Sequence, residues 1–566
     1  MIIRITKKKP APKPQPPRNL ADVIERLKTY TSLTDARRRD LISACNSLAR
    51  LLGLPLESIL TDVAVLRDAL ASVHPVQGRI SKKRVSNIKS DLAAALQLTG
   101  VLPDDDPDVE PSGQWVAFMG HAKEPYQRWT LARFSRFCSL SKIEPEAVAD
   151  ATLRSFAEYL DARVIAHDPR TTVKAVGKAF NTIVTQNSIP LNRLSTAAGT
   201  NYVTARISAY PPSLQADLAA YLQRLEKPDP FSDGGPDRPL RSKSLRNIEA
   251  HIRQLLQAAV DVGFPLDQFQ TLADLLDLQV LGRAFDGMIE RFGGRVPTSL
   301  PNILGTLLAI AKYHVGSPPE LLVKLRKARK GFADRLGSNI PRMSEKAARR
   351  LEQFDDERNV ELLVDLPHKL IKRANKTPGT QRSTMDATCA TAIAILLACP
   401  MRVEDLAELE LGADIQAVQR GKKTYYLLHI AGEKTKNGAA IVAEIEPPLS
   451  TVVAAYLKNH RKFAADDPGL WIFPRPSGGP QTPDHFSEKV KEKISREIGL
   501  DMNAHLFRHL SAKLFLEAHP GNYEEVRRIL AHKSIETTAQ IYSPLSNQAA
   551  FKRFNAILED YRGEDL

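Results

Sequence analysis

Six side chains near the C-terminus are of the types that act on phosphate esters. They are two arginines, a lysine, two histidines and a tyrosine: Arg402, Lys436, His505, Arg508, His532 and Tyr542. Arginine binds two phosphate oxygens through a planar fork of N–H donors, and histidine and lysine can carry protons. A phenol can attack phosphorus once nearby cations offset its ordinary pKa of about 10. The set therefore predicts covalent chemistry on a phosphodiester.

Some of these residues also have a simpler structural explanation. Arg402 could pair with a neighbouring acid, and Tyr542 could pack its own helix as an amphipathic side chain. His505 and His509 could form a zinc pair one helical turn apart, but no third ligand follows at a useful spacing. The sequence also has no acidic cluster for two metal ions and no Gly-x-x-x-x-Gly-Lys-Ser/Thr loop. We therefore expect phosphate chemistry without a metal or ATP.

The elements that must position the two arginines are predicted from local patterns. Residues 387–397 are almost continuously apolar, which predicts a buried helix with Arg402 just beyond its end. His505 and Arg508 are three residues apart, so they share one face of a helix. We expect a second helix over 523–531 and a short helix that carries Tyr542.

The lysine lies between two predicted strands. Residues 425–431 and 440–445 are rich in β-branched and aromatic side chains, and Asn437-Gly438 is a hairpin-turn signal. Lys434 and Lys436 are therefore expected at or beside the tip of a hairpin, where an ammonium group can enter a groove and protonate a leaving oxygen. Either lysine fits this role, although exposed turn lysines are common.

Length and charge set the broad class. A chain of 566 residues is expected to form about three to five domains. Its net charge of +14 indicates a polyanionic partner. No apolar run is long enough for a membrane span or a signal peptide, and the four cysteines have no paired spacing. These features predict a protein of a reducing cytosol.

The rest of the chain is expected to be helical. Residues 1–18 form a basic, proline-rich arm, followed by helical bundles over 19–101, 114–225 and 240–318 and a C-terminal domain over 340–566. The bundles share a pattern: an amphipathic helix, a corner with glycine or proline, and two further helices. They are interpreted as three variations on one bundle, with chance similarity of small helical bundles as the alternative.

Two basic segments are candidates for contact with phosphates. The first contains Lys7, Lys8 and Lys9 in the N-terminal arm, and the second contains Lys324, Arg326 and Lys327 in a predicted helix after the third bundle. Each is interpreted either as a DNA-binding segment or as a solvated basic surface.

The ordered C-terminal motifs resemble those of the tyrosine recombinase (phage integrase) family over roughly residues 344–561. The matching boxes are Cys399-Pro-Met-Arg402-Val-Glu-Asp405-Leu, His505-Leu-Phe-Arg508-His and Leu530-Ala-His532-Lys-Ser-Ile-Glu-Thr-Thr … Tyr542. Lys436 matches the family's active-site lysine best, and Lys434 remains an alternative. The chain departs from the family pattern at Pro400-Met401, Asp405 and Ala531, but no catalytic group is lost.

The resemblance implies a mainly α fold with a small β-hairpin or sheet in an α+β catalytic domain. It implies that Tyr542 attacks a scissile phosphate and forms a 3′-phosphotyrosine. Arg402 and Arg508 would stabilise the transition state, Lys436 would protonate the leaving oxygen, His505 would act as acid and base, and His532 would position a phosphate oxygen. It further implies a recombination site in double-stranded DNA, integration or excision of a mobile element, and a four-way junction within a homotetramer or a hetero-assembly of recombinases.

The same resemblance implies a cytoplasmic, nucleoid-associated bacterial protein whose apolar C-terminal segment, residues 549–558, docks on a neighbouring protomer or packs on its own domain. Residues 240–318 would be the core-binding domain. The alternatives are a type IB topoisomerase, a telomere resolvase, or a catalytically silent DNA-binding regulator of the same fold.

Overall fold

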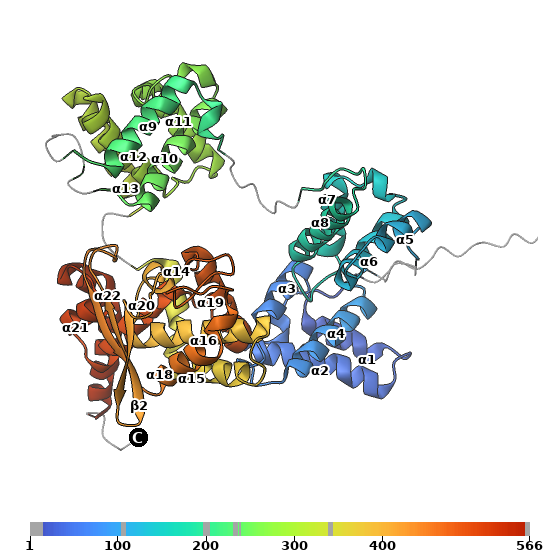
Figure 1. Ribbon diagram of the computed structural model, residues 1–566. Helices are drawn as coiled ribbons and strands as arrows, with labels where there is room; N and C mark the ends of the chain where they lie inside the picture. Colours follow the sequence, from blue (N-terminus) through green and yellow to red (C-terminus); the bar gives the residue numbers. More distant parts are fainter. Residues whose placement is uncertain are drawn as a thin grey trace, which may run out of the picture. The chain divides into compact units, whose positions relative to one another are not determined.

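The computed structural model describes residues 15–103, 109–195, 204–229, 236, 239–337 and 343–560. Their structure is mainly helical, with one three-stranded antiparallel sheet in the C-terminal part (Figure 1). The expected fold class is therefore confirmed. No described helix is both long enough and apolar enough to cross a membrane. The basic segment with Lys7, Lys8 and Lys9 lies outside the described residues.

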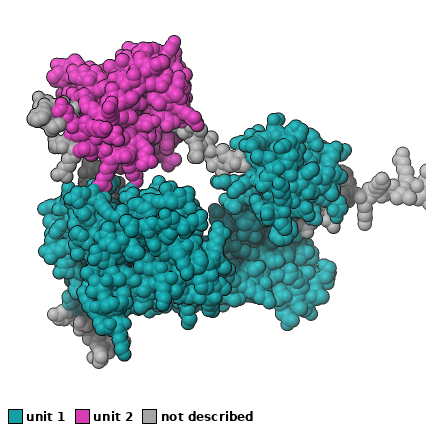
Figure 2. Space-filling view, viewed as in Figure 1, with its two compact units in different colours: residues 1–199, 344–538, 544–566 teal, residues 200–343, 539–543 magenta. Residues whose placement is uncertain are grey.

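The chain forms two compact units (Figure 2). Unit 1 comprises residues 1–199, 344–538 and 544–566, and unit 2 comprises residues 200–343 and 539–543. Unit 1 includes separate hydrophobic cores for the first two bundles, and unit 2 has a core of its own.

The expected order of elements occurs three times. The first bundle contains α2 (Asp35–Leu52), η1 (Leu56–Ser58), α3 (Val63–Ser72) and α4 (Lys82–Leu98). The second contains α6 (Pro125–Leu140), η2 (Pro145–Ala147), α7 (Asp150–Asp161) and α8 (Pro169–Gln186). The third contains α10 (Ser242–Asp261), η4 (Leu266–Gln268), η5 (Asp274–Leu276), α11 (Leu278–Arg291) and α12 (Leu300–Ile310).

The corner after the first helix of each series contains a residue in the left-handed backbone conformation. Gly53, Lys142 and Gly263 have φ angles of 66°, 56° and 97°. This left-handed conformation ends a helix and turns the chain into the following proline. In the second bundle a lysine takes this conformation, which glycine adopts with less strain.

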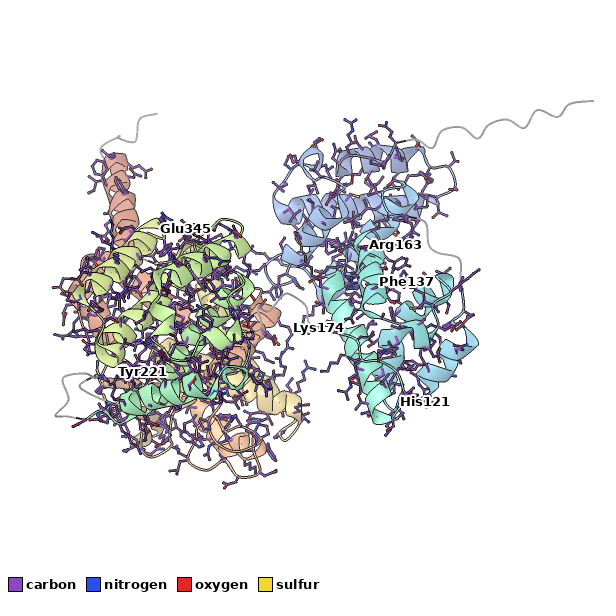
Figure 3. The ribbon with its side chains drawn as sticks, turned by 90° about the horizontal axis from the view of Figure 1, so that it is seen from above. His121, Phe137, Arg163, Lys174, Tyr221 and Glu345 are labelled. Carbon is purple, nitrogen blue, oxygen red and sulfur yellow. The ribbon has the colours of Figure 1, made fainter. Side chains whose placement is uncertain are left out.

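Each series is preceded by a further helix that the sequence pattern did not predict. These are α1 (Leu20–Thr29), α5 (Gly113–Gly120) and α9 (Pro212–Glu226). Leu214, Leu218 and Tyr221 of α9 belong to the same hydrophobic core as α10–α12. By packing, α9 therefore belongs with the third bundle rather than with residues 114–225, because its apolar stripe completes that core. Tyr221 is labelled in Figure 3.

An aromatic cluster fills the second bundle. Phe134 and Phe156 pack edge to face with ring centroids 5.0 Å apart, and Phe137 lies 5.2 Å from Phe156. The guanidinium of Arg163 stacks 4.3 Å from the centroid of Tyr159 (Figure 3 labels Phe137 and Arg163). Such contacts add to the burial of apolar surface.

The C-terminal domain surrounds one buried helix. This is α16 (Gln381–Ala398), whose side chains from Asp386 to Leu396 are all buried. The other helices are α14 (Glu345–Glu352), α15 (Glu357–Ala374), α17 (Val403–Ala407), α18 (Leu449–Asn459), α19 (Pro483–Ile498), α20 (Ala504–Ala518), α21 (Tyr523–Ile529) and α22 (Ile535–Asp560). The helix that carries Tyr542 is therefore α22, which is much longer than expected.

The sheet differs from the predicted hairpin in two ways. Its strands β1 (Ile415–Arg420), β2 (Lys423–Ile430) and β3 (Ile441–Ile445) are antiparallel in the order β1-β2-β3. The first strand was not predicted, because four of its six side chains are exposed, three of these are polar, and apolar and polar residues do not alternate along it. Ile430 pairs with Ile441, so residues 431–440 form a long loop and Asn437-Gly438 is not a two-residue turn.

Candidate active site

Arg508 connects the backbones of the three motifs that were singled out in the sequence. It lies in the first part of α20 and is 3% exposed. Its Nη1 donates to the carbonyl of Pro400 at 2.7 Å, and its Nη2 donates to the carbonyl of Leu530 at 2.6 Å. These carbonyls come two residues before Arg402 and two residues before His532. The guanidinium therefore fixes both neighbouring segments.

Arg402 is the N-cap residue of the short helix α17 and is half-buried. Its Nη1 lies 3.5 Å from Oδ1 of Asn437, and Nδ2 of Asn437 donates to the carbonyl of Ala531 at 2.5 Å. Burial raises the pKa of Asp405, and the nearby Arg402 partly offsets this effect. Asn437 thus joins the first arginine, the lysine loop and the segment before His532, a role that the sequence pattern did not reveal.

His532 is placed by the C-terminal cap of α21. The amide of Ala531 donates to the carbonyl of Arg528 at 3.1 Å, and the amide of His532 donates to that of Arg527 at 2.9 Å. This is the Schellman pattern, which requires a left-handed residue at the position of Ala531, where φ is 48°. A glycine would adopt this conformation with less strain, which explains in physical terms why the departure at Ala531 matters.

The hydrogen bond of His532 fixes its tautomer. Its Nδ1 lies 3.0 Å from Oγ1 of Thr538, and this hydroxyl donates its own proton to the carbonyl of Ser534 at 3.0 Å. The hydroxyl must therefore accept from Nδ1–H, which leaves Nε2 as the acceptor nitrogen of the neutral ring. Burial and the charges of Arg508 and Arg402 lower the pKa of His532 to about 4.

His505 lies beside the same two arginines. Partial burial, Arg508 and Arg402 lower its pKa, although its side chain is exposed at the surface. Its ring packs edge to face on His509, with centroids 4.9 Å apart. Burial and the nearby His505 and Arg508 also lower the pKa of His509, to about 4. Neutral rings can accept protons, so the region favours general-base chemistry.

The two lysines of the loop have different surroundings. Nζ of Lys434 lies 2.9 Å from Oδ1 of Asp414 and 3.1 Å from Oε2 of Glu410. Although partial burial acts the other way, these carboxylates raise the pKa of Lys434. Lys436 is exposed and precedes Asn437, the residue that contacts Arg402. The contacts therefore favour Lys434 as a structural lysine and Lys436 as the lysine available for chemistry.

The loop is folded around Thr435, which is 1% exposed. Its hydroxyl lies 3.1 Å from the carbonyl of Gly432 and 2.8 Å from that of Ala439, so it ties the two ends of the loop together. A Cβ at Gly432 would lie 2.7 Å from the carbonyl oxygen of Gly438. Only glycine permits this approach, which keeps the loop narrow at its base.

The structure brings five of the six predicted residues into unit 1: Arg402, Lys436, His505, Arg508 and His532. Tyr542 is 2% exposed and lies in the segment 539–543, which groups with unit 2 (Figure 2). Its position beside the basic cluster therefore stays a prediction. Among the described residues, no group of three or more His, Cys, Asp or Glu side chains is arranged to hold a metal ion.

The basic residues of the second predicted DNA-binding segment are on α13 (Pro319–Arg335) of unit 2. Lys324, Arg326 and Lys327 are all exposed, whereas Leu325 is 2% exposed and packs in the core of the third bundle. The helix is thus anchored by its apolar side and presents its cations to solvent.

Residues 365–549 match the model of the Phage integrase family, and this match assigns that segment of the chain to the family. A comparison with curated proteins gives no match.

Three solved structures are similar to parts of the chain. A lambda integrase (75–356) dimer bound to a COC′ core site is 17% identical, with 58% of this chain and 94% of that chain covered and a TM-score of 0.34. XerH recombinase bound to difH is 13% identical, with 57% and 89% covered and a TM-score of 0.29. XerA recombinase is 13% identical, with 54% and 98% covered and a TM-score of 0.24. With TM-scores below 0.5, these proteins define neither the activity nor the partners of this chain.

Proposed function

We propose that this protein is a site-specific DNA recombinase that cleaves and rejoins DNA through a 3′-phosphotyrosyl intermediate. The observation that carries the proposal is the hydrogen-bonded connection of Arg402, Asn437, Arg508 and His532 through the carbonyls of Pro400, Leu530 and Ala531. Two arginines beside two neutral histidines suit a phosphodiester whose negative charge increases in the transition state.

In the proposed reaction, the phenol oxygen of Tyr542 attacks phosphorus and the bond to the 5′ oxygen breaks. His505 accepts the phenol proton, Lys436 donates a proton to the leaving 5′ oxygen, and His532 positions a phosphate oxygen. Arg402 and Arg508 balance the charge of the pentavalent phosphorus. The phosphotyrosine preserves the energy of the broken ester, so rejoining to a partner strand uses neither ATP nor a metal ion.

The remaining parts of the chain support binding in this proposal. The bundles over 19–101, 114–225 and 240–318 enclose or extend along double-stranded DNA, and the domain over 340–566 carries the chemistry. Lys324, Arg326 and Lys327 on α13 contact phosphates, and so do Lys7, Lys8 and Lys9.

The end of α22 supports assembly into a homotetramer or a hetero-assembly on DNA. Phe551, Phe554, Ile557 and Leu558 are spaced by three or four residues and are 68%, 54%, 52% and 42% exposed. This apolar face is therefore not packed on its own domain, and we propose that it docks on a neighbouring protomer. A Phe554→Ser variant should bind single sites normally and lose assembly on paired sites, measured by native electrophoresis.

The test of the activity is a suicide substrate: duplex DNA with the end sequence of the element, nicked near the cleavage point, incubated without metal or ATP. A protein–DNA adduct that resists denaturation and maps to Tyr542 would establish the chemistry, and Tyr542→Phe should bind the same DNA without forming it. Tight binding without an adduct, also in the presence of partner recombinases, would instead identify a catalytically silent DNA-binding regulator.

A further inference from the structure

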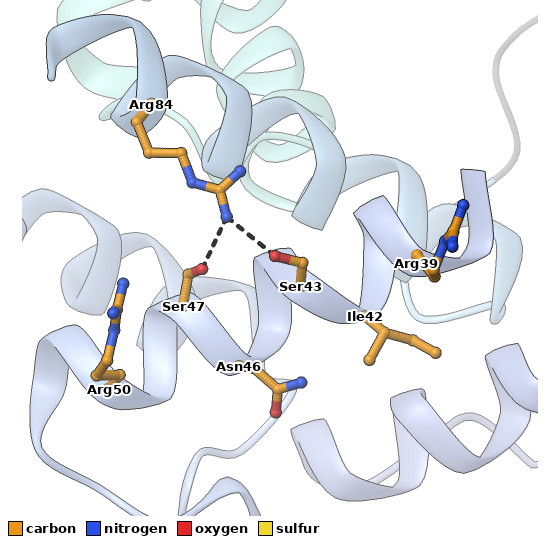
Figure 4. Close-up of a pocket in the computed structure, with 7 residues that line it drawn as sticks. All are labelled: Arg39, Ile42, Ser43, Asn46, Ser47, Arg50 and Arg84. Carbon is orange, nitrogen blue, oxygen red and sulfur yellow. Dashed lines mark hydrogen bonds between the residues drawn. The ribbon is translucent and has the colours of Figure 1, made fainter. Parts of the chain in front are cut away.

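The first bundle has an open groove of about 540 Å³ between α2 and α4, far along the sequence from the proposed catalytic residues (Figure 4). Its lining consists of three arginines, three small polar side chains and one isoleucine: Arg39, Arg50, Arg84, Ser43, Asn46, Ser47 and Ile42. No acidic side chain lines it. The lining is therefore suited to an anion.

The arginines of this groove differ from others on the same helix. Arg37 pairs with Asp91 at 2.6 Å, and Arg38 pairs with Asp35 at 2.7 Å. Within the described part of the chain, no ion pair is found for the three groove arginines. The protein therefore does not neutralise their charges. A purely structural role would favour arginines that are paired with carboxylates.

One groove arginine is held in place by the groove itself. Nη2 of Arg84 on α4 donates to Oγ of Ser43 and Oγ of Ser47 on α2, at 3.0 Å each (Figure 4). These bonds use one nitrogen of the guanidinium and fix its position, so less side-chain entropy is lost when the group binds an anion. The small serine and asparagine side chains also leave room for a ligand backbone to approach.

The spacing along α2 selects the kind of anion. Arg39, Ser43, Asn46, Ser47 and Arg50 repeat at three- or four-residue steps and so share one helical face. At 1.5 Å per residue, Arg39 and Arg50 are about 16 Å apart along the axis, with Arg84 reaching in between. A single phosphate cannot span that distance, whereas successive phosphates of one DNA strand, about 3.4 Å apart along the duplex axis, can.

We propose that this groove binds the phosphate backbone of duplex DNA, as a contact site additional to the catalytic domain. The proposal rests on the proposed function for the choice of DNA as partner. Because only phosphates are contacted, the site adds affinity without base preference.

The test is the salt dependence of binding to a 60-base-pair duplex by the full-length chain. Three lost phosphate contacts lower the slope of log K against log salt by about 2.7. The affinity gap between the wild type and the triple variant Arg39→Gln, Arg50→Gln, Arg84→Gln should then widen by about 40-fold between 200 mM and 50 mM salt. The double variant without Arg84→Gln keeps the bonds to the serines, and its slope should fall by about 1.8.

A control triple variant removes the same charge from three exposed lysines outside the groove: Lys123, Lys174 and Lys178. An equal change of slope in the control would overturn the proposal, because it would show only a general effect of charge. An unchanged slope in both groove variants would overturn it as well. The groove would instead be assigned to a small anion if two results came together. The wild type would bind inorganic phosphate saturably and the triple variant would not, while DNA binding would be the same in both.

The suicide substrate separates this proposal from the proposed function. A short duplex that covers only the cleavage site should give the same adduct yield with the wild type and with the groove variants. Loss of the adduct in the wild type would contradict the proposed function, while the slopes would still report on the groove.

Discussion

Alanine substitution of Lys434 and Lys436, one at a time, should separate a structural lysine from a catalytic one within a single loop. Lys434 lies 2.9 Å from Oδ1 of Asp414, whose side chain is 5% exposed. Without the lysine, this buried carboxylate retains the backbone N–H of Glu410 at 3.0 Å as a donor. A hydrogen bond to a charged group contributes about 1.5–3 kcal/mol. The 44% exposure of Lys434 reduces this to about 1–2 kcal/mol.

The two variants should therefore give opposite results in two assays. Lys434→Ala should lower the Tm by about 2–8 °C and retain most adduct formation on the suicide substrate. Lys436→Ala should change the free energy of unfolding by less than about 0.5 kcal/mol, because the residue is exposed. Its single-turnover cleavage rate should fall by about 10²- to 10⁴-fold, as expected for loss of a general acid.

A substrate with sulfur in place of the leaving 5′ oxygen provides the control. A thiolate leaves without a proton, since thiols have a pKa of about 8.5, and cleavage by Lys436→Ala should recover on this substrate. The reasoning would be refuted if Lys434→Ala abolished cleavage at an unchanged Tm and the sulfur substrate restored it. If the sulfur substrate restored cleavage by neither variant, the general acid would lie elsewhere.

Three further predictions concern stability. The pKa values of His509 and His532 in the folded protein are lowered to about 4, so the unfolded chain binds more protons below pH 6.5. The free energy of unfolding should therefore fall between pH 6.5 and pH 4, by about 3 kcal/mol per histidine at most. Urea titrations of the wild type and of His509→Gln would show this, and an equal loss of stability in both proteins would contradict it. In the wild type, Nζ of Lys493 lies 2.5 Å from the buried carboxylate of Asp386, and Lys493→Met removes this cation. The free energy of unfolding, measured by chemical denaturation, should fall by about 3–5 kcal/mol. An unchanged denaturation midpoint would contradict the importance of the pair. Ala531→Gly relieves the left-handed backbone at φ 48° and should raise stability by up to about 1 kcal/mol by calorimetry, a loss of stability being the contrary result.

Local sequence patterns were sufficient for part of the structure. The apolar run over 387–397 predicted the buried helix α16, and glycine followed by proline predicted the corners after Gly53 and Gly263, because both depend on chain-local preferences. The three-residue spacing of His505 and Arg508 placed them together on α20 for the same reason.

Other features depend on contacts between distant residues. The ion pair of Lys434 with Asp414 requires β1, an exposed strand whose polar side chains give little periodic signal. The packing of α9 on the third bundle crosses a proline-rich stretch that resembles a boundary. Asn437 bridges Arg402 and Ala531 only once the loop is folded, and neither its type nor its neighbours in sequence indicate that bridge.

The contacts of Arg508 bear on how much sequence variation this site can accept. Its guanidinium is held by the carbonyl oxygens of Pro400 and Leu530, which every amino acid provides. Side chains at these two positions can therefore change without loss of the arginine's hydrogen-bond partners, provided that the backbone path is kept. The arginine itself has no such freedom, because a lysine has one nitrogen and cannot reach both carbonyls with a rigid fork. Chains that differ widely around the site can thus inherit the same arrangement, as long as a side chain of similar size fills the buried position of Leu530.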